Sequence, residues 1–482
     1  MKRYDIIVVG GGVVGSAIAR ELARYQIRVA VLEQHPDVCC ETSGRNSAVV
    51  HGGFAYDPGT LKARFCVEGC LEFDRVAKEL DVPFRRTGKV LVGNTPQDRK
   101  SLERTLETGR RNGSRGLRLI GKEELHRLVP AVNGEFALYS PMSGIMDPFQ
   151  YTVALAENAV QNGVDYYLGT AVRAVERVQD GWYRLKTPRG CFEAEWVINS
   201  AGLGSAQISR MLGLGGKRVI GSKGTYLILD KCVGSLLPMP VYPVPSNTYM
   251  GIHVTPTIDG KVLVGPDAET TMEFEDYSVE QRNIDFLAQS AGQLWPHIEK
   301  RDYIRSYAGI LPKWVDEQGV IQDFSIELDP RAPNTVNLVG IESPGLTAAL
   351  PIGRYVAGQI GQRQELRPKA GFEPCRSPAP HFAQMEPQAR EQLIREQPDY
   401  GEIVCRCGLV TRGEILHAIH NPLHVTTLTG IKYRAGAMMG RCQGGYCQAK
   451  ITELILRETG CQPEDMLYSR EGSPLFYGRI RT

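Results

Sequence analysis

The chain has 482 residues, more than one ordinary hydrophobic core can accommodate, so we expect two or three domains. Its 42% apolar and 23% charged residues are typical of a globular protein, and its formal charge of +2 gives no reason to expect a nucleic-acid partner. The sequence contains no run of 18 apolar residues, so a membrane-spanning helix is not expected. Residues 1–3 lead directly into a predicted strand with no signal-peptide cleavage site, so a cytoplasmic location is expected.

The first 33 residues have the pattern of a strand, a glycine-rich turn, a helix and a second strand. Residues 4–9 are apolar and β-rich, residues 16–25 have helical composition, and residues 28–32 form the second strand. Further along, residues 165–168, 171–178, 182–187 and 192–199 predict four more strands. The stretches between these regions, residues 80–150 and 216–312, are richer in turns and aromatic residues. They are expected to form a domain made of insertions.

The turn carries the spacing Gly10-x-Gly12-x-x-Gly15, with Val14 inside it, and the second strand ends at Glu33. The glycines permit a tight turn and a close approach of a pyrophosphate to backbone N–H groups at a helix N-terminus. The acidic residue can accept hydrogen bonds from ribose hydroxyls. The pattern therefore predicts a dinucleotide site, and the alternative is a purely structural turn.

A polar segment soon after the second strand favours FAD over NAD. Backbone amides and hydroxyl groups there could bind the pyrophosphate and the ribityl chain of FAD. The residues are Thr42, Ser43, Arg45, Asn46 and Ser47.

Together with residues 197–202 and 340–347, these segments resemble the D-amino-acid-oxidase-like family of FAD oxidoreductases, in the family's order over residues 1–360. Residues 344–347 also look like a turn that begins a helix. The positive N-terminal end of that helix would stabilise the negative charge of a reduced flavin. The alternative is that this turn is an ordinary helix cap. The resemblance implies further cofactor contacts at Val172, Ala201, Gly202, Gly345, Leu346 and Thr347.

The family resemblance implies a Rossmann-like α/β FAD-binding domain interleaved with an antiparallel-sheet substrate domain. We expect residues 1–361 to form this unit, with FAD-binding parts at about 1–79, 151–215 and 313–361, and substrate parts at about 80–150 and 216–312. Residues 362–400 contain six prolines and predict a linker with one helix around residues 386–395. Residues 401–482 would form a small helical domain.

His51 follows the flavin loop directly and is flanked by glycines. A histidine can accept the hydroxyl proton when hydride leaves an alcohol carbon, although a lone histidine is more often structural. Residues 43–51 and 56–63 resemble the family branch of glycerol-3-phosphate dehydrogenases and oxidases and L-2-hydroxyglutarate dehydrogenases. His253 and Tyr226 lie in further matching segments and are candidate substrate contacts. The alternative for His253 is a hydrogen-bonded histidine of the sheet.

The branch substrates share a secondary alcohol and an anionic group, so a cation is expected in the pocket. The branch usually has arginine where this chain has Leu311. Lys313 could substitute as a point charge. The exact substrate therefore stays open at this level.

Four cysteines, Cys405, Cys407, Cys442 and Cys447, lie within 43 residues near the C-terminus. Four thiolates can hold a [2Fe-2S] cluster or zinc, and one and then four intervening residues are atypical of zinc. The spacing resembles the bacterioferritin-associated-ferredoxin-like (BFD-like) [2Fe-2S] domain, with Met438 where glycine is common; a vestigial site is the third possibility. The order of domains resembles the catalytic subunit of anaerobic glycerol-3-phosphate dehydrogenases.

These observations predict an FAD-dependent dehydrogenase that oxidises a small anionic alcohol, with glycerol 3-phosphate as the leading substrate. Electrons would leave through the cluster to a partner subunit or quinone-linked acceptor, and any membrane association would be peripheral and through that partner. One alternative is a 2-hydroxyglutarate or amino-acid dehydrogenase. The other is a non-catalytic electron-transfer subunit.

Overall fold

The computed structural model describes residues 1–178, 181–245, 251–377 and 379–478. Its first sheet is built around β1 (Lys2–Val9), which lies parallel to β12 (Gly190–Asn199) on one side and β2 (Val29–Leu32) on the other. The apolar side chains of β1 are buried on both faces, as a central parallel strand requires. The sheet continues through β9 (Asp165–Tyr167), β10 (Ala174–Arg177), β11 (Tyr183–Thr187), β19 (Ser325–Glu327) and β20 (Thr335–Val339).

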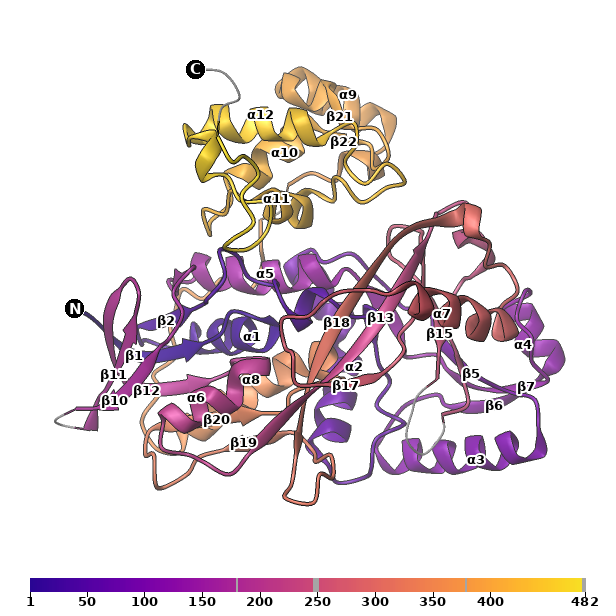
Figure 1. Ribbon diagram of the computed structural model, residues 1–482, viewed down its shortest axis with the longest axis horizontal. Coiled ribbons are helices and arrows are strands. Elements are labelled where there is room, and N and C mark those ends of the chain that lie inside the picture. Colours follow the sequence, from indigo (N-terminus) through magenta and orange to yellow (C-terminus); the bar gives the residue numbers. More distant parts are fainter. Residues whose placement is uncertain (179–180, 246–250, 378, 479–482) are drawn as a thin grey trace.

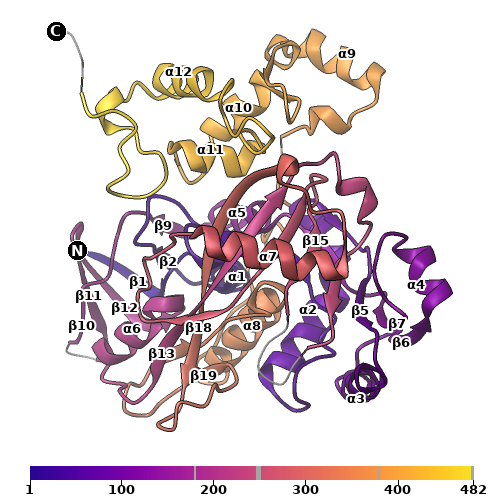
Figure 2. The same ribbon diagram turned by 45° about the vertical axis from the view of Figure 1, so that its right-hand side comes forward.

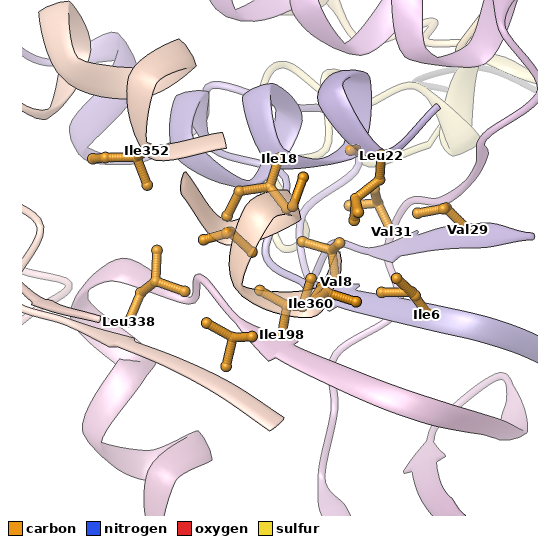
Figure 3. Packing of buried hydrophobic residues seen from close by; sticks show 14 of the residues in the cluster. Ile6, Val8, Ile18, Leu22, Val29, Val31, Ile198, Leu338, Ile352 and Ile360 are labelled. Atoms are coloured by element: carbon orange, nitrogen blue, oxygen red, sulfur yellow. The ribbon is translucent and has the colours of Figure 1, made fainter. Parts of the chain in front are cut away.

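Helices α1 (Val13–Leu22) and α8 (Gly345–Gly361) pack together against this sheet and bury the largest hydrophobic cluster (Figure 3). Helices α2 (Leu61–Leu80) and α5 (Pro148–Gln161) flank them. The crossing of α2 and α8 is close, because a Cβ on Gly69 would lie 2.0 Å from the Thr347 carbonyl oxygen. This crossing fixes the N-terminal end of α8.

The second sheet contains nine strands and holds two long antiparallel neighbours, β13 (Arg218–Leu229) and β18 (Tyr303–Val315). Helices α3 (Pro96–Arg111), α4 (Lys122–Leu128) and α7 (Gln281–Leu294) pack on its strands (Figure 1). The other strands are β5 (Lys89–Gly93), β6 (Arg118–Gly121), β7 (Phe136–Ser140), β14 (Val241–Pro243), β15 (His253–Pro256), β16 (Val262–Gly265) and β17 (Glu269–Thr271).

The chain passes between the two large sheets through a third sheet of three strands. It consists of β3 (Val49–Val50), β8 (Gly144–Met146) and β4 (Phe84–Arg85). Helix α6 (Ser205–Met211) follows β12 and contacts β20.

The proline-rich segment runs along the first unit rather than away from it. Gln26 N–H donates to the Arg367 carbonyl at 2.8 Å, and Lys369 N–H donates to the Arg24 carbonyl at 2.7 Å. The expected helix is present as α9 (Pro387–Glu396).

The C-terminal unit contains a short hairpin, β21 (Ile403–Cys405) and β22 (Val410–Thr411), and helices α10 (Arg412–Ile419), α11 (Leu428–Ala435) and α12 (Gln448–Thr459). It sits beside α5 and the ends of β13 and β18, as both views show (Figures 1 and 2).

The α/β architecture with an antiparallel second domain and a small helical C-terminal domain confirms the expected fold class. Element ends differ from the expected ones. Helix α1 begins at Val13 and ends at Leu22; it starts before the expected residue 16 because the Ser16 N–H donates to the Gly12 carbonyl at 2.9 Å. Strand β18 continues to Val315, past the expected domain boundary at residue 312. Within the described residues, no helix is both long and apolar enough to cross a membrane.

Candidate active site and cluster site

A cavity of about 610 Å³ extends from the glycine-rich turn to the inner face of the second sheet. At the turn it is lined by Gly10 and Gly12, and at the sheet by His51, Tyr226 and His253. Residues predicted for the cofactor and the substrate therefore share one continuous space. Other predicted cofactor residues on its wall are Val14, Glu33, Thr42, Ser43, Asn46, Ser47, Val172, Ala201, Gly202, Gly345 and Leu346.

The glycine-rich turn lies so close to neighbouring residues that side chains at Gly10 and Gly12 would be crowded. Gly10 has a φ of +102°, and a Cβ there would lie 2.8 Å from the Ser200 carbonyl oxygen. A Cβ on Gly12 would lie 3.1 Å from the Ser43 hydroxyl, which itself accepts the Val13 N–H at 2.9 Å. This cradle at the N-terminus of α1 fits the pyrophosphate of FAD.

Glu33 lies at the end of β2 on the cavity wall and is buried. Its carboxylate accepts N–H groups from Gly11 at 2.6 Å and from His35 at 2.8 Å. Burial raises the pKa of Glu33, against the lowering effects of His35 and of these hydrogen bonds. The remaining lone pairs of the carboxylate are the acceptors available to a ribose.

Three predicted cofactor residues lie behind the wall rather than on it. Arg45 donates to the Ala308 carbonyl at 3.2 Å, and its guanidinium lies 4.0 Å from the Tyr277 ring centroid. Gly15 packs the helix onto the turn, and Thr347 is buried. These three residues shape the site from outside the cavity.

His51 is half-buried and faces the cavity just after β3. Its backbone N–H donates to the Thr347 hydroxyl at 3.1 Å, and its carbonyl accepts the Cys66 thiol at 3.3 Å. Desolvation, followed by the charge of Lys89 and the proximity of His253, keeps the pKa of His51 well below its usual value. The imidazole is therefore neutral at pH 7 and keeps one ring nitrogen with a free lone pair, although the lowered pKa makes it a weaker base.

His253 projects from β15 and is only 4% exposed. Its Nδ1 lies 3.1 Å from the Thr255 hydroxyl, and its ring stacks on Tyr242 with centroids 3.9 Å apart. Burial, and then Lys89, lower the pKa of His253 to about 3. Tyr226 stacks in the same way on Tyr307. The sheet thus presents a rigid aromatic floor.

The cation predicted at Lys313 already has a counter-ion, although one carboxylate balances only one of the two ammonium groups that contact it. Glu342 accepts an ion pair from Lys313 at 2.9 Å and another from Lys62 at 2.8 Å. Leu311 lines the cavity and supplies no charge there. The geometry does not favour Lys313 as a free anion-binding group.

Sequence reasoning missed Lys89 and Tyr242, which both line the cavity. Lys89 begins β5 and is 2% exposed, with its ammonium 4.1 Å from the Tyr242 ring centroid. The sequence does contain a signal for Lys89, because this lysine directly precedes the apolar run Val90-Leu91-Val92. A buried strand seldom carries a charge, so a lysine there indicates a special role.

The four C-terminal cysteines gather at one end of the small domain. The Cys407 and Cys442 sulfurs are 3.6 Å apart, and the Cys405 and Cys447 thiols also contact each other. Burial opposes ionisation of Cys442, yet the N–H of Gly444 and then the Cys407 thiol lower the pKa of Cys442. Two thiol pairs suit the two irons of a [2Fe-2S] cluster.

Met438 has a φ of +60°, the left-handed conformation that favours glycine. This conformation explains why glycine would be common at its position. Its N–H points to the Cys447 sulfur.

The small domain is held against the first unit by a buried ion-pair cluster. Arg434 of α11 donates to Asp37 at 2.7 Å and to Glu157 of α5 at 3.1 Å. Tyr433 stacks on Phe149, with ring centroids 4.1 Å apart. Charged groups meeting at full burial indicate a fixed interface.

The small domain also contacts the second sheet. Arg441 pairs with Asp230 at 3.1 Å, and Lys231 donates to the Cys407 carbonyl at 3.3 Å. The cysteine-bearing loop therefore touches the loop that follows β13.

Comparison with known proteins agrees with both halves of the chain. A family model described as FAD dependent oxidoreductase matches residues 5–359, and one described as BFD-like [2Fe-2S] binding domain matches residues 403–457. The glycerol 3-phosphate dehydrogenase of Caloramator mitchellensis is 34% identical over 482 residues, which is 99% of each chain. The L-2-hydroxyglutarate dehydrogenase of Indibacter alkaliphilus is 31% identical over 394 residues, covering 73% of this chain and 98% of that one.

Solved structures show the same fold. The L-alpha-glycerophosphate oxidase of Mycoplasma pneumoniae, which has FAD bound, is similar with a TM-score of 0.72 and 27% identity. The similarity covers 78% of this chain and 99% of that one. The glycerol-3-phosphate dehydrogenase of Bacillus halodurans has a TM-score of 0.68 at 16% identity, covering 96% of this chain and 92% of that one.

The chain therefore belongs to the family of FAD-dependent oxidoreductases and carries a BFD-like [2Fe-2S] domain. It is an enzyme whose cofactors are FAD and a [2Fe-2S] cluster.

Proposed function

We propose that the protein is a dehydrogenase that oxidises the secondary alcohol of glycerol 3-phosphate and passes the electrons to a protein or quinone-linked acceptor. The observation that carries this proposal is a neutral histidine, His51, in a cavity continuous with the flavin cradle. The full-length relative from C. mitchellensis, a glycerol 3-phosphate dehydrogenase, supports the choice of substrate.

Bound FAD supplies an acceptor for hydride from the alcohol carbon, and the cluster supplies a one-electron carrier. The chain's own part is to place the alcohol against His51, whose neutral imidazole nitrogen takes the hydroxyl proton. The stacked pairs Tyr226–Tyr307 and Tyr242–His253 exclude water from the reacting face. The product is the corresponding ketone.

Thr347 links the proton acceptor to the cofactor side. Its hydroxyl accepts the His51 N–H, and it sits in the first turn of α8, whose N-terminal end lines the cavity at Gly345. This contact, made by the backbone N–H of His51, holds the His51 backbone beside that helix end. The helix N-terminus favours negative charge at the same place.

The test is anaerobic mixing of the purified holoenzyme with glycerol 3-phosphate, L-2-hydroxyglutarate and a set of amino acids, while flavin absorbance is followed. We expect only glycerol 3-phosphate to bleach the flavin quickly. His51→Ala should slow this single-turnover reduction at least about tenfold, because general-base catalysis contributes about 10²–10⁴-fold. His420→Ala, at an exposed histidine paired with Glu458, is the matched control and should react as the wild type.

L-2-hydroxyglutarate is the second candidate, favoured by the relatives that oxidise it and match nearly their full length. Bleaching by that compound alone would replace glycerol 3-phosphate in the proposal. If no compound bleaches the flavin but a reduced partner flavoprotein does, the protein is an electron-transfer subunit, and our proposal is wrong.

A further inference from the structure

We propose that Lys89 is the residue that binds the anionic group of the substrate, in place of the arginine missing at Leu311. This inference rests on the proposed oxidation of an anionic alcohol and names the cation of that site. The ligand chemistry is a phosphate or carboxylate group carried on a small alcohol.

Lys89 is built into the cavity wall as a charge without a counter-charge. Its side chain is 2% exposed and lines the same cavity as His51 and His253. The ammonium contacts the ring faces of Tyr242 at 4.1 Å and Phe54 at 4.9 Å. Within the part of the chain that the structure describes, no carboxylate forms an ion pair with it.

The other cations on the cavity wall are engaged or remote. Lys62 and Lys313 share Glu342. Arg173 lies at the nucleotide end, close to Thr170, whose N–H donates to the Glu33 carbonyl. Lys89 is thus the cation that faces the two histidines.

An isolated buried ammonium is costly, and proteins seldom keep one without a partner. Desolvation lowers the pKa of Lys89 to about 8, while the Cys66 and Cys70 thiols act in the opposite direction. An anion placed beside the ammonium would offset the lost hydration. Because His51 and His253 are neutral, Lys89 is the cation without an ion-pair partner beside them.

The strand geometry also limits where Lys89 can point. Gly88 precedes it with a φ of +76°, and its N–H donates to the Ser143 carbonyl at 2.9 Å. Lys89 itself pairs with Ser140 of β7. The backbone at Lys89 is therefore fixed, and the contacts with the Tyr242 and Phe54 rings hold the ammonium in position before substrate arrives.

The test uses holoenzyme variants Lys89→Met and Lys89→Arg, with Lys122→Met as a matched control at an exposed lysine paired with Glu135. Inorganic phosphate and succinate, which cannot be oxidised, are titrated against the oxidised flavin spectrum. We expect Lys89→Met to raise the Kd for the preferred anion at least about tenfold, the loss expected for one charge-assisted contact. Lys89→Arg should restore binding to within about fivefold, and Lys122→Met should match the wild type.

With reactive substrate, Lys89→Met should raise the concentration giving half-maximal flavin reduction by a similar factor. The maximal reduction rate should stay within about threefold, since the variant keeps His51. In the ligand-free state, its Tm should equal or exceed that of the wild type, because a lone buried charge has been removed. The preference between phosphate and succinate identifies the anionic group.

Several outcomes separate this inference from the proposed function. An unchanged anion Kd in Lys89→Met, with wild-type flavin still bleached by glycerol 3-phosphate, overturns the role of Lys89 alone. A lower ligand-free Tm together with an unchanged Kd makes Lys89 a structural cation–π residue. If no compound bleaches the flavin but anion binding depends on Lys89, the anion site stands and the proposed reaction falls.

Discussion

His51, His253 and Lys89 are three basic side chains that face one cavity. Loss of water is the main cause that lowers the pKa of each, and the charge of Lys89 lowers the pKa of both histidines further. The two histidines therefore stay neutral, while the Cys66 and Cys70 thiols act to raise the pKa of Lys89. The arrangement keeps a proton acceptor and a fixed cation side by side at neutral pH.

Buried His253 should make the fold sensitive to acid. Its pKa in the folded chain is about 3, whereas the unfolded chain has a value near 6.5, so the unfolded state binds more protons between these values. Stability is therefore full above pH 6.5 and is lost as pH falls. Between pH 7.5 and 5, His253 should account for about 2 kcal/mol of lost stability.

Thermal unfolding at pH 7.5 and 5 checks this expectation in the wild type and in His253→Gln, which does not titrate. The variant should lose less Tm across the interval than the wild type. Equal losses in the two proteins would mean that His253 is protonated in the fold.

At the same scale, the sequence indicates residue types but not their partners. His51, Gly10 and Gly12, for which the sequence predicts catalytic and cofactor roles, line one cavity. The sequence also predicts Lys313 as a substitute for the missing arginine, but the structure pairs its ammonium with Glu342, a contact that the local sequence does not indicate.

Among the elements, α8 depends on glycines that allow close approach. Gly69 of α2 lies against the Thr347 carbonyl, and Gly353 would place a Cβ 2.8 Å from the Ala17 carbonyl of α1. Thr347 in turn holds the His51 N–H. Thr347 therefore takes part both in the packing of α8 against α2 and in the placement of the His51 backbone.

Gly69→Ala should destabilise the protein and weaken FAD retention, because the new methyl group cannot coexist with a carbonyl 2.0 Å away. We expect a loss of about 1–3 kcal/mol, measured by thermal unfolding and by the FAD content after gel filtration. Gly358→Ala is the control in α8, since nothing lies within 4 Å of its added Cβ and alanine favours a helix. A Gly69→Ala protein as stable as Gly358→Ala would contradict the close crossing.

The central strands β1 and β12 of the first sheet were predicted because parallel central strands are continuous apolar runs. Strands β19 and β20 of the same sheet were not predicted from the sequence. Those of the second sheet were described only as turn-rich and aromatic. In β18, buried and half-buried residues follow one another without strict alternation over 13 residues. Its pairing with β13 is a long-range contact that local pattern does not encode.

At the level of the whole molecule, the cluster domain is joined to both larger units. Arg434 contacts Asp37 and Glu157 of the first unit, and Arg441 contacts Asp230 beside the second sheet. The cysteine spacing predicted the domain, but its docking depends on pairs of residues that are 211, 277 and 397 positions apart.

Arg434→Ala should loosen this docking while leaving the flavin site intact. Removing one partner of a buried ion pair costs about 3–5 kcal/mol, because the carboxylates left behind are uncompensated. We expect an earlier, separate unfolding transition of the cluster domain and at least tenfold slower electron transfer from reduced flavin to cluster, followed by rapid-freeze paramagnetic resonance. Arg457→Ala, at an exposed pair with Glu458, should behave as the wild type. Unchanged transfer in Arg434→Ala would show that the domain stays docked by other contacts.

The double attachment of the small domain has a mechanical consequence. The small domain contacts the first unit through Arg434 and the region beside the second sheet through Arg441, so it bridges these two parts of the chain. Because the Arg441 side chain is largely exposed, its contact is the weaker of the two, and relative movement of the two bodies would break it first. We expect the distance between the flavin site and the four cysteines to change little as long as both contacts hold.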